Sequence, residues 1–136
     1  MDRRNLIKAR AASALFAGAA AAMLIAACIL PQMKLNKLKS YLEPRARAAI
    51  EMTQTSETEK AQKLILEMAE KTNAEKSVLL MLFDHDGVTD LCHALSAASE
   101  LAEAGDKAQL LAELTAVLTE LERLYATNEA SLENLI

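Results

Sequence analysis

Residues 98–118 read ASELAEAGDKAQLLAELTAVL, and this stretch decides the fold class. A single glycine, Gly105, stands between two segments whose apolar residues recur at helical spacing. Glycine readily adopts the left-handed conformation that ends a helix, and Asp106 is suited to cap the helix that follows. A short glycine turn between two amphipathic helices predicts an antiparallel helical hairpin. Its apolar positions are Val88, Leu91, Cys92, Leu95, Ala98 and Ala102 before the turn, and Leu110, Leu111, Leu114, Val117, Leu118, Leu121, Leu124 and Tyr125 after it.

The region before this hairpin is also helical in pattern. Residues 32–50 carry an apolar stripe that Pro44 interrupts, and we expect this proline to kink or divide the helix because it removes a backbone donor. Ser56, followed three residues later by Glu59, matches a capping box and predicts that a helix begins there. The apolar face of that helix is Ala61, Leu64, Ile65 and Met68.

Val78–Phe83 is a run of six apolar residues in which no face is polar. We expect it to be helical, since no second strand pattern is present, and either buried on all sides or in contact with lipid. The predicted fold is therefore all-α. It consists of an N-terminal transmembrane helix followed by a small antiparallel helical bundle, residues 31–136, that ends in the long helical hairpin.

The N-terminal part has the composition of a membrane anchor. Residues 1–10 form a basic segment, and residues 11–30 contain no charge. Twenty helical residues span about 30 Å, the thickness of a bilayer core. We predict an uncleaved signal-anchor helix over 11–30 that contacts membrane lipids, with Pro31 marking its end or its entry into the next helix. A short basic N-terminus directly before the apolar core favours a single-pass protein of the cell membrane whose C-terminal domain is extracytoplasmic.

A second interpretation of the same segment stays open. Ile25-Ala26-Ala27-Cys28 fits a bacterial lipobox, in which an aliphatic residue and two small residues precede a cysteine that is lipidated after signal cleavage. In that case the protein would be a lipoprotein modified at Cys28. Lys and Arg flank the apolar segment on both sides, so charge alone does not decide the orientation.

Charge is distributed unevenly along the chain. Residues 1–47 hold nine Lys/Arg and two Asp/Glu, a net charge of +7, whereas residues 48–136 carry a net charge of −11. The acidic part would be repelled by phosphate backbones, so we do not expect nucleic-acid binding. The two cysteines lie in different predicted helices, and we expect no disulfide between them.

The residues that could carry chemistry are concentrated in LLMLFDHDGVTDLCH, residues 79–93. Asp84 is an N-cap candidate. On a helix, Asp86, Asp90 and His93 share one face and could hold a divalent metal ion, but acidic residues near a helix N-terminus also stabilise the helix without any ligand. We favour capping and surface charge, and we expect no cofactor.

Nucleophilic catalysis has little support in the sequence. Cys92 and His93 are adjacent on a helix and therefore point about 100° apart, so they do not form a direct thiolate–imidazole pair. The chain also has neither a glycine-rich phosphate loop nor a Gly-x-Ser-x-Gly elbow. We predict that the protein is not an enzyme.

An N-terminal apolar helix, a helical domain of about a hundred residues, Phe83-Asp84-His85 before the hairpin, and Ser131-Leu132-Glu133-Asn134 near the end occur together in this chain. In these features it resembles the family catalogued as domain of unknown function 4363, small membrane-anchored proteins of Gram-positive bacteria. The resemblance spans nearly the whole chain. It implies a membrane-anchored helical architecture, and it implies no activity, because the family has none assigned.

These observations together predict a membrane-anchored, non-enzymatic helical scaffold or protein-interaction module of the bacterial cell envelope, with a membrane or envelope protein as its partner. The alternative is a lipoprotein, lipidated at Cys28 after signal cleavage, that binds a ligand or a partner.

Overall fold

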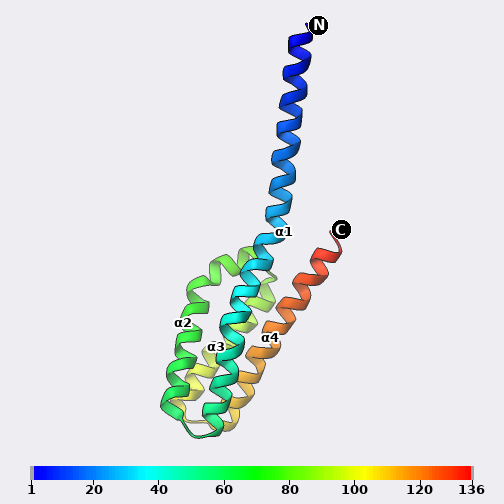
Figure 1. Cartoon of the computed structure of the whole chain (residues 1–136). Coiled ribbons are helices and arrows are strands. Elements are labelled where there is room, and N and C mark those ends of the chain that lie inside the picture. The colour runs from blue at the N-terminus through cyan, green and yellow to red at the C-terminus, as the bar shows by residue number, and fades with distance from the viewer. Residues whose placement is uncertain (1, 136) are drawn as a thin grey trace.

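The computed structural model describes residues 2–135, and within them the fold is all-α. Four helices follow one another: α1 (Arg3–Gln54), α2 (Thr58–Leu82), α3 (His85–Ala104) and α4 (Lys107–Glu133). Each helix packs against two others, with contacts between α1 and α2, α2 and α3, α3 and α4, and α4 and α1. The result is an antiparallel four-helix bundle from which the first half of α1 extends as a stalk (Figure 1).

The helix α1 is a single helix from Arg3 to Gln54, with Pro31 and Pro44 both inside it. The expectation that Pro44 could divide the helix, or that Pro31 ends one helix, is therefore wrong. Burial explains the continuity at Pro44, because Leu42 and Ala46 on either side of it are both in the core and hold the backbone in helical register. The guanidinium of Arg45 also donates a hydrogen bond to the carbonyl oxygen of Tyr41, at 3.0 Å, beside the interrupted ladder.

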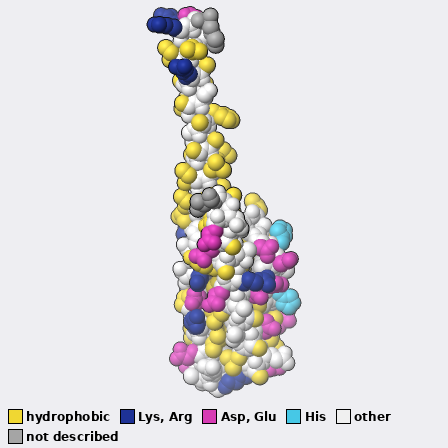
Figure 2. All heavy atoms as spheres, turned by 90° about the vertical axis from the view of Figure 1, so that its right-hand side faces the viewer, with side chains coloured by type: hydrophobic (Ala, Val, Ile, Leu, Met, Phe, Trp, Pro, Cys, Tyr) yellow, Lys and Arg dark blue, Asp and Glu magenta, His cyan; other side chains and the backbone are white. Residues whose placement is uncertain are grey.

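The two halves of α1 lie in different surroundings. Residues 11–30 contain no buried side chain, and Figure 2 shows them as an apolar column that stands clear of the bundle. The helix Arg3–Gln54 is long and apolar enough to cross a membrane. From Leu35 onward the same helix contributes to the bundle core, so one continuous helix is both the candidate membrane span and a member of the bundle.

The core of the bundle confirms the predicted apolar stripes. On α1 the buried side chains recur every three or four residues, and on α2 and α3 they lie on one face of the helix. On α4 the buried residues are Leu110, Leu114, Val117, Leu121 and Leu124, whereas Leu111, Leu118 and Tyr125 from the predicted stripe are half-buried at its margin.

The α3–α4 hairpin forms as predicted. Gly105 has φ +76°, in the left-handed region, and ends α3. The Oδ1 atom of Asp106 accepts a hydrogen bond from the backbone N–H of Gln109 at 3.1 Å, so Asp106 is the N-cap of α4. This turn lies at the end of the bundle that is farthest from the stalk (Figure 1).

The expectation that Ser56 caps α2 is wrong. Ser56 has φ +62° and belongs to the end of α1, where its N–H donates to Thr53 O and the N–H of Glu57 donates to Met52 O. These two bonds form a Schellman motif, in which a left-handed residue closes the end of a helix. The helix α2 starts two residues later, its N-cap position is Glu57, and no side chain caps it. The backbone bonds that end α1 thus fix the conformation of Ser56 and prevent it from starting α2.

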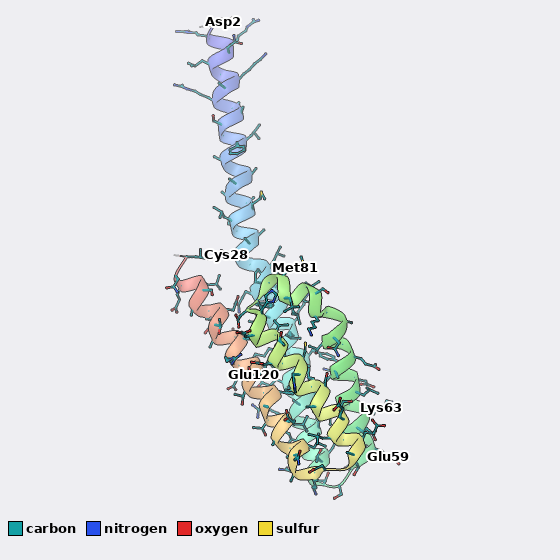
Figure 3. All side chains as sticks on the ribbon, turned by 180° about the vertical axis from the view of Figure 1, so that it is seen from behind. Asp2, Cys28, Glu59, Lys63, Met81 and Glu120 are labelled. Atoms are coloured by element: carbon teal, nitrogen blue, oxygen red, sulfur yellow. The ribbon has the colours of Figure 1, made fainter. Side chains whose placement is uncertain are left out.

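The apolar run Val78–Phe83 is helical as far as Leu82, but it is not buried on all sides. Leu79 is fully buried, whereas Val78 and Met81 are exposed. The reason is position, because this run is the last part of α2 and lies at the end of the bundle from which α1 leaves (Figure 3). There the neighbouring helices cover only one side of α2.

Two buried threonines in the bundle give a matched test of hydrogen bonding in the core. The hydroxyl of Thr72 is buried without a hydrogen-bond partner among the described residues, whereas that of Thr53 donates to Ala49 O at 2.7 Å. Thr72→Val should raise the free energy of unfolding by about 1 kcal/mol, because it removes an unsatisfied buried hydroxyl. Thr53→Val should lower it by about 1 kcal/mol. Urea denaturation of the full chain in mild detergent measures both changes, and a loss of stability in Thr72→Val as large as that in Thr53→Val would refute this explanation.

Candidate functional site

The turn between α2 and α3 gathers most of the residues that the sequence singles out. Phe83 is extended, with φ −128° and ψ 171°, which ends α2. The Oδ2 atom of Asp84 then accepts a hydrogen bond from the N–H of Gly87 at 2.9 Å, so Asp84 is the N-cap of α3. Asp86 lies in the first turn of α3, where its negative charge interacts favourably with the helix dipole. Two of the three carboxylates in this stretch thus stabilise the start of a helix.

Gly87 brings α3 close to α4 at this turn. A Cβ atom built on Gly87 would lie 2.8 Å from Cδ2 of Leu124 on α4, which is too close for any side chain to fit without a shift of Leu124. The close approach lines up the α2–α3 turn with the last third of α4. An open pocket of about 330 Å³ lies between them, and it is lined by Leu82, Phe83, Asp84, Leu124, Thr127, Asn128 and Ser131. The Phe83-Asp84 pair and Ser131, which are far apart in the sequence, therefore meet at one end of the bundle.

Asp86, Asp90 and His93 are not arranged as a set of metal ligands. Among residues 2–135, no three His, Cys, Asp or Glu side chains are placed to share one metal ion. The carboxylate of Asp90 instead forms an ion pair with Arg123 on α4, with Oδ2 2.9 Å from Nη2. A cation at this position would have to displace the guanidinium group.

Substitution at Asp84 separates capping from metal binding. Asp84→Ala should lower the free energy of unfolding by about 0.5–2 kcal/mol, and Asp84→Asn should restore most of the loss because the amide oxygen can accept the same N–H. Asp90→Ala removes only an exposed ion pair and should cost less than about 1 kcal/mol. Thermal melts with and without a chelator provide the measurement. We expect the chelator to leave the melting temperature of the wild type unchanged, and a chelator-dependent decrease would instead indicate a metal site.

A shallow groove between α2 and α3 contains Cys92 and His93 together with Asn73, Lys76, Thr89, Ser96, Ala97 and Glu100. Burial raises the pKa of the Cys92 thiol, and the nearby positive charge of Lys76 offsets only part of this increase. Cys92 is therefore a neutral thiol at pH 7, and a protonated thiol is a poor nucleophile. The groove does not supply an activated cysteine.

The base of the stalk is joined to α4 by polar contacts that the sequence pattern does not predict, although Tyr125 itself belongs to the predicted apolar stripe. Gln32 donates to the hydroxyl of Tyr125 at 3.3 Å and accepts from the side-chain amide of Asn128 at 2.7 Å. The ammonium group of Lys39 lies 4.5 Å from the centre of the Tyr125 ring, a cation–π contact. The hydrogen bonds of Gln32 hold α4 against α1 directly after Pro31, and the Lys39 contact does so about two turns farther along α1. Their only signal in the sequence is a polar residue directly after the apolar segment, and its partners lie more than ninety residues away.

Cys28, the candidate lipidation site, is half-exposed on α1 just outside the bundle (Figure 3). It lies seven residues before Leu35, the first residue of α1 that is buried in the core. Both the thiol and the backbone around it are therefore separate from the core packing.

Comparison with known protein families matches residues 30–135 to one family, whose description is Domain of unknown function (DUF4363). Comparison with curated proteins and with solved structures gives no match. The matched region begins where α1 enters the bundle and includes the α2–α3 turn, the pocket beside it and the whole hairpin. Because the match covers more than half of the sequence, the chain belongs to the family described as Domain of unknown function (DUF4363).

Proposed function

We propose that the protein is a membrane-anchored, non-enzymatic helical scaffold or interaction module of the bacterial cell envelope, which holds a membrane or envelope protein as its partner. The observation that carries this proposal is the dual role of α1. Its first half is an exposed apolar helix, whereas its second half is part of the bundle core. A bundle built on its own anchor is held at a fixed place beside the membrane, as a docking module requires.

The chemistry of the side chains supports a binding role over a catalytic one. Asp84 and Asp106 are occupied as helix caps, Asp90 is paired with Arg123, and Cys92 is a buried neutral thiol. The exposed faces of the bundle carry charged side chains of both signs, as Figure 2 shows for one of them. Such faces suit specific contacts with another protein.

Co-purification tests this function directly. The full chain, tagged at its C-terminus and extracted in mild detergent, should repeatedly recover the same membrane or envelope protein. A matched control replaces residues 11–30 with an unrelated apolar helix of equal length. If the bundle is the binding surface, the control recovers the same partner. Repeated recovery of the chain alone, after crosslinking in intact cells, would contradict the proposal.

The proposed orientation places the bundle on the extracytoplasmic side. Protease added to intact cells from which the wall has been removed should then digest the bundle, and a tag at the N-terminus should stay protected. A bundle that resists digestion until the cells are lysed would reverse this orientation.

The alternative function is that of a lipoprotein lipidated at Cys28 with a binding role. It is supported by the position of Cys28, because cleavage before this residue would leave the whole family-matched region, residues 30–135, on the mature protein. Mass spectrometry of the mature N-terminus decides between the two. A lipid-modified Cys28 that disappears in Cys28→Ser supports the lipoprotein, and an intact N-terminal segment excludes it.

A further inference from the structure

Exposed apolar side chains in the bundle are concentrated at one end. Beyond Leu30 the structure describes five exposed large hydrophobic residues, and four of them, Met33, Val78, Met81 and Leu135, belong to the segments that lie where α1 leaves the bundle. The fifth, Leu66, stands alone on α2. Met81 is the most exposed of the five, at 81%, and Figure 3 shows it at the end of α2 beside the stalk. A cluster of this kind at one end of a charged bundle indicates a surface that contacts another protein or a membrane.

An ion pair shows how far α2 extends along α1. The ammonium group of Lys34 lies 2.8 Å from the carboxylate of Glu75, so these two residues are at the same height. The helix α2 continues for seven residues beyond Glu75, to Leu82, and these residues rise by about 10 Å. Because α2 is antiparallel to α1, its end is level with the last turn of residues 11–30.

The helix α4 reaches the same level. Asn128 is hydrogen-bonded to Gln32 at 2.7 Å, and α4 continues for five residues beyond Asn128, to Glu133, a rise of about 8 Å. Figure 1 shows the C-terminal end of α4 at the height at which α1 leaves the bundle. If residues 11–30 fill the hydrocarbon core, the ends of α2 and α4 therefore lie at the boundary between the hydrocarbon core and the headgroup layer.

We propose that the end of α2 and the end of α4 insert Val78, Met81 and Leu135 into the interfacial layer of the bilayer, so that the bundle stands end-on on the membrane. This inference rests on the membrane anchoring of the proposed function. We infer that lipid covers the exposed side chains of Met33, Val78, Met81 and Leu135. These side chains continue the apolar surface of the stalk at the level at which the proposed anchor places the bilayer surface. Asp84, His85 and Asp86 at the α2–α3 turn are exposed and remain in contact with headgroup water.

Burial of apolar side chains, rather than charge, drives this contact. The bundle, residues 31–136, has a net charge of −7, because residues 31–47 carry +4 and residues 48–136 carry −11. The contact should therefore form on vesicles of zwitterionic phosphatidylcholine alone.

The test places an environment-sensitive fluorophore at single cysteines in the full chain, reconstituted in phosphatidylcholine vesicles. The background carries Cys28→Ala and Cys92→Ala, and circular dichroism confirms that each variant is folded. Three sites are compared, Met81→Cys, Leu66→Cys and Ala20→Cys. Leu66 is the matched control, because it is also an exposed apolar residue of α2 but lies about 22 Å farther along the helix. Ala20 reports whether the anchor itself is in the bilayer.

We expect spin-labelled lipids to quench the fluorophore at positions 20 and 81 and to leave position 66 unaffected, while a water-soluble quencher acts mainly at position 66. If lipid quenches the fluorophore at position 20 but position 81 behaves like position 66, the bundle does not contact the membrane end-on, whereas the membrane anchoring of residues 11–30 is supported. If position 20 is not quenched, the membrane anchoring itself is wrong. Protection of position 81 from the water-soluble quencher without quenching by lipid would overturn the lipid contact and indicate a second protein surface.

Discussion

Leu91→Ala should lower the free energy of unfolding by about 3–5 kcal/mol, the range for a large side chain removed from a closely packed core. Leu91 is completely buried in α3, the helix that packs against both α2 and α4. The shortened side chain leaves a cavity that neighbouring residues from three helices can fill only in part. A loss of this size is a large share of the total stability of a small domain.

Urea denaturation of the full chain in mild detergent, followed by circular dichroism, measures this effect, because we expect the apolar stalk to stay helical in the micelle and to contribute a constant signal. Leu66→Ala is the matched control. It makes the same chemical change at a residue of α2 that is 46% exposed, and it should alter stability by no more than about 0.5 kcal/mol. Equal losses at the two positions would show that the bundle core is not packed as described.

Ala20→Arg should remove most of the protein from the membrane fraction. Position 20 is at the middle of residues 11–30, and an arginine at the centre of a membrane helix costs about 2.5–3.5 kcal/mol. Ten of these twenty residues are alanine, which is only weakly apolar. The favourable free energy of inserting this segment is therefore small, and it does not offset the cost of the charge. A cost of this size corresponds to a decrease of roughly a hundredfold in the insertion equilibrium.

Carbonate extraction of membranes, followed by quantification of the pellet, measures the change. Ala20→Leu should remain in the pellet at least as well as the wild type. Leu66→Arg, which adds the same charge to an exposed position of the bundle, should not change the distribution. The anchoring role of residues 11–30 would be refuted by an Ala20→Arg variant that pellets like the wild type.

The sequence predicts the features that depend on neighbours along the chain. The Gly105–Asp106 turn, the cap at Asp84 and the buried stripe of α4 each follow from residues within one or two turns of a helix. The apolar stalk follows from composition alone. For these features, local propensity and tertiary packing favour the same structure.

Features that depend on packing between distant residues are different. Ser56 fits both the capping box that would start α2 and the Schellman motif that ends α1. The partly buried helix α1 favours the Schellman motif. Pro44 stays inside a helix because the core on both sides holds it there. The exposure of Met81 depends on how far α2 extends along α1, and this register follows from the packing of the buried side chains of the two helices. The partner of Asp90 is likewise an arginine 33 residues away on another helix. No local pattern contains that information.

The unbroken helix through Pro31 has a geometric consequence. Because each residue of a helix turns it by about 100°, the five residue steps from Leu30 to Leu35 fix the angle between the apolar surface of the stalk and the sides of the bundle. Inserting one residue there would rotate the bundle by about 100° about the axis of α1, whereas inserting seven would return it to within about 20°. Any molecule bound to one side of the stalk would therefore always face the same side of the bundle. If the stalk rotates about its axis, the bundle rotates with it by the same angle.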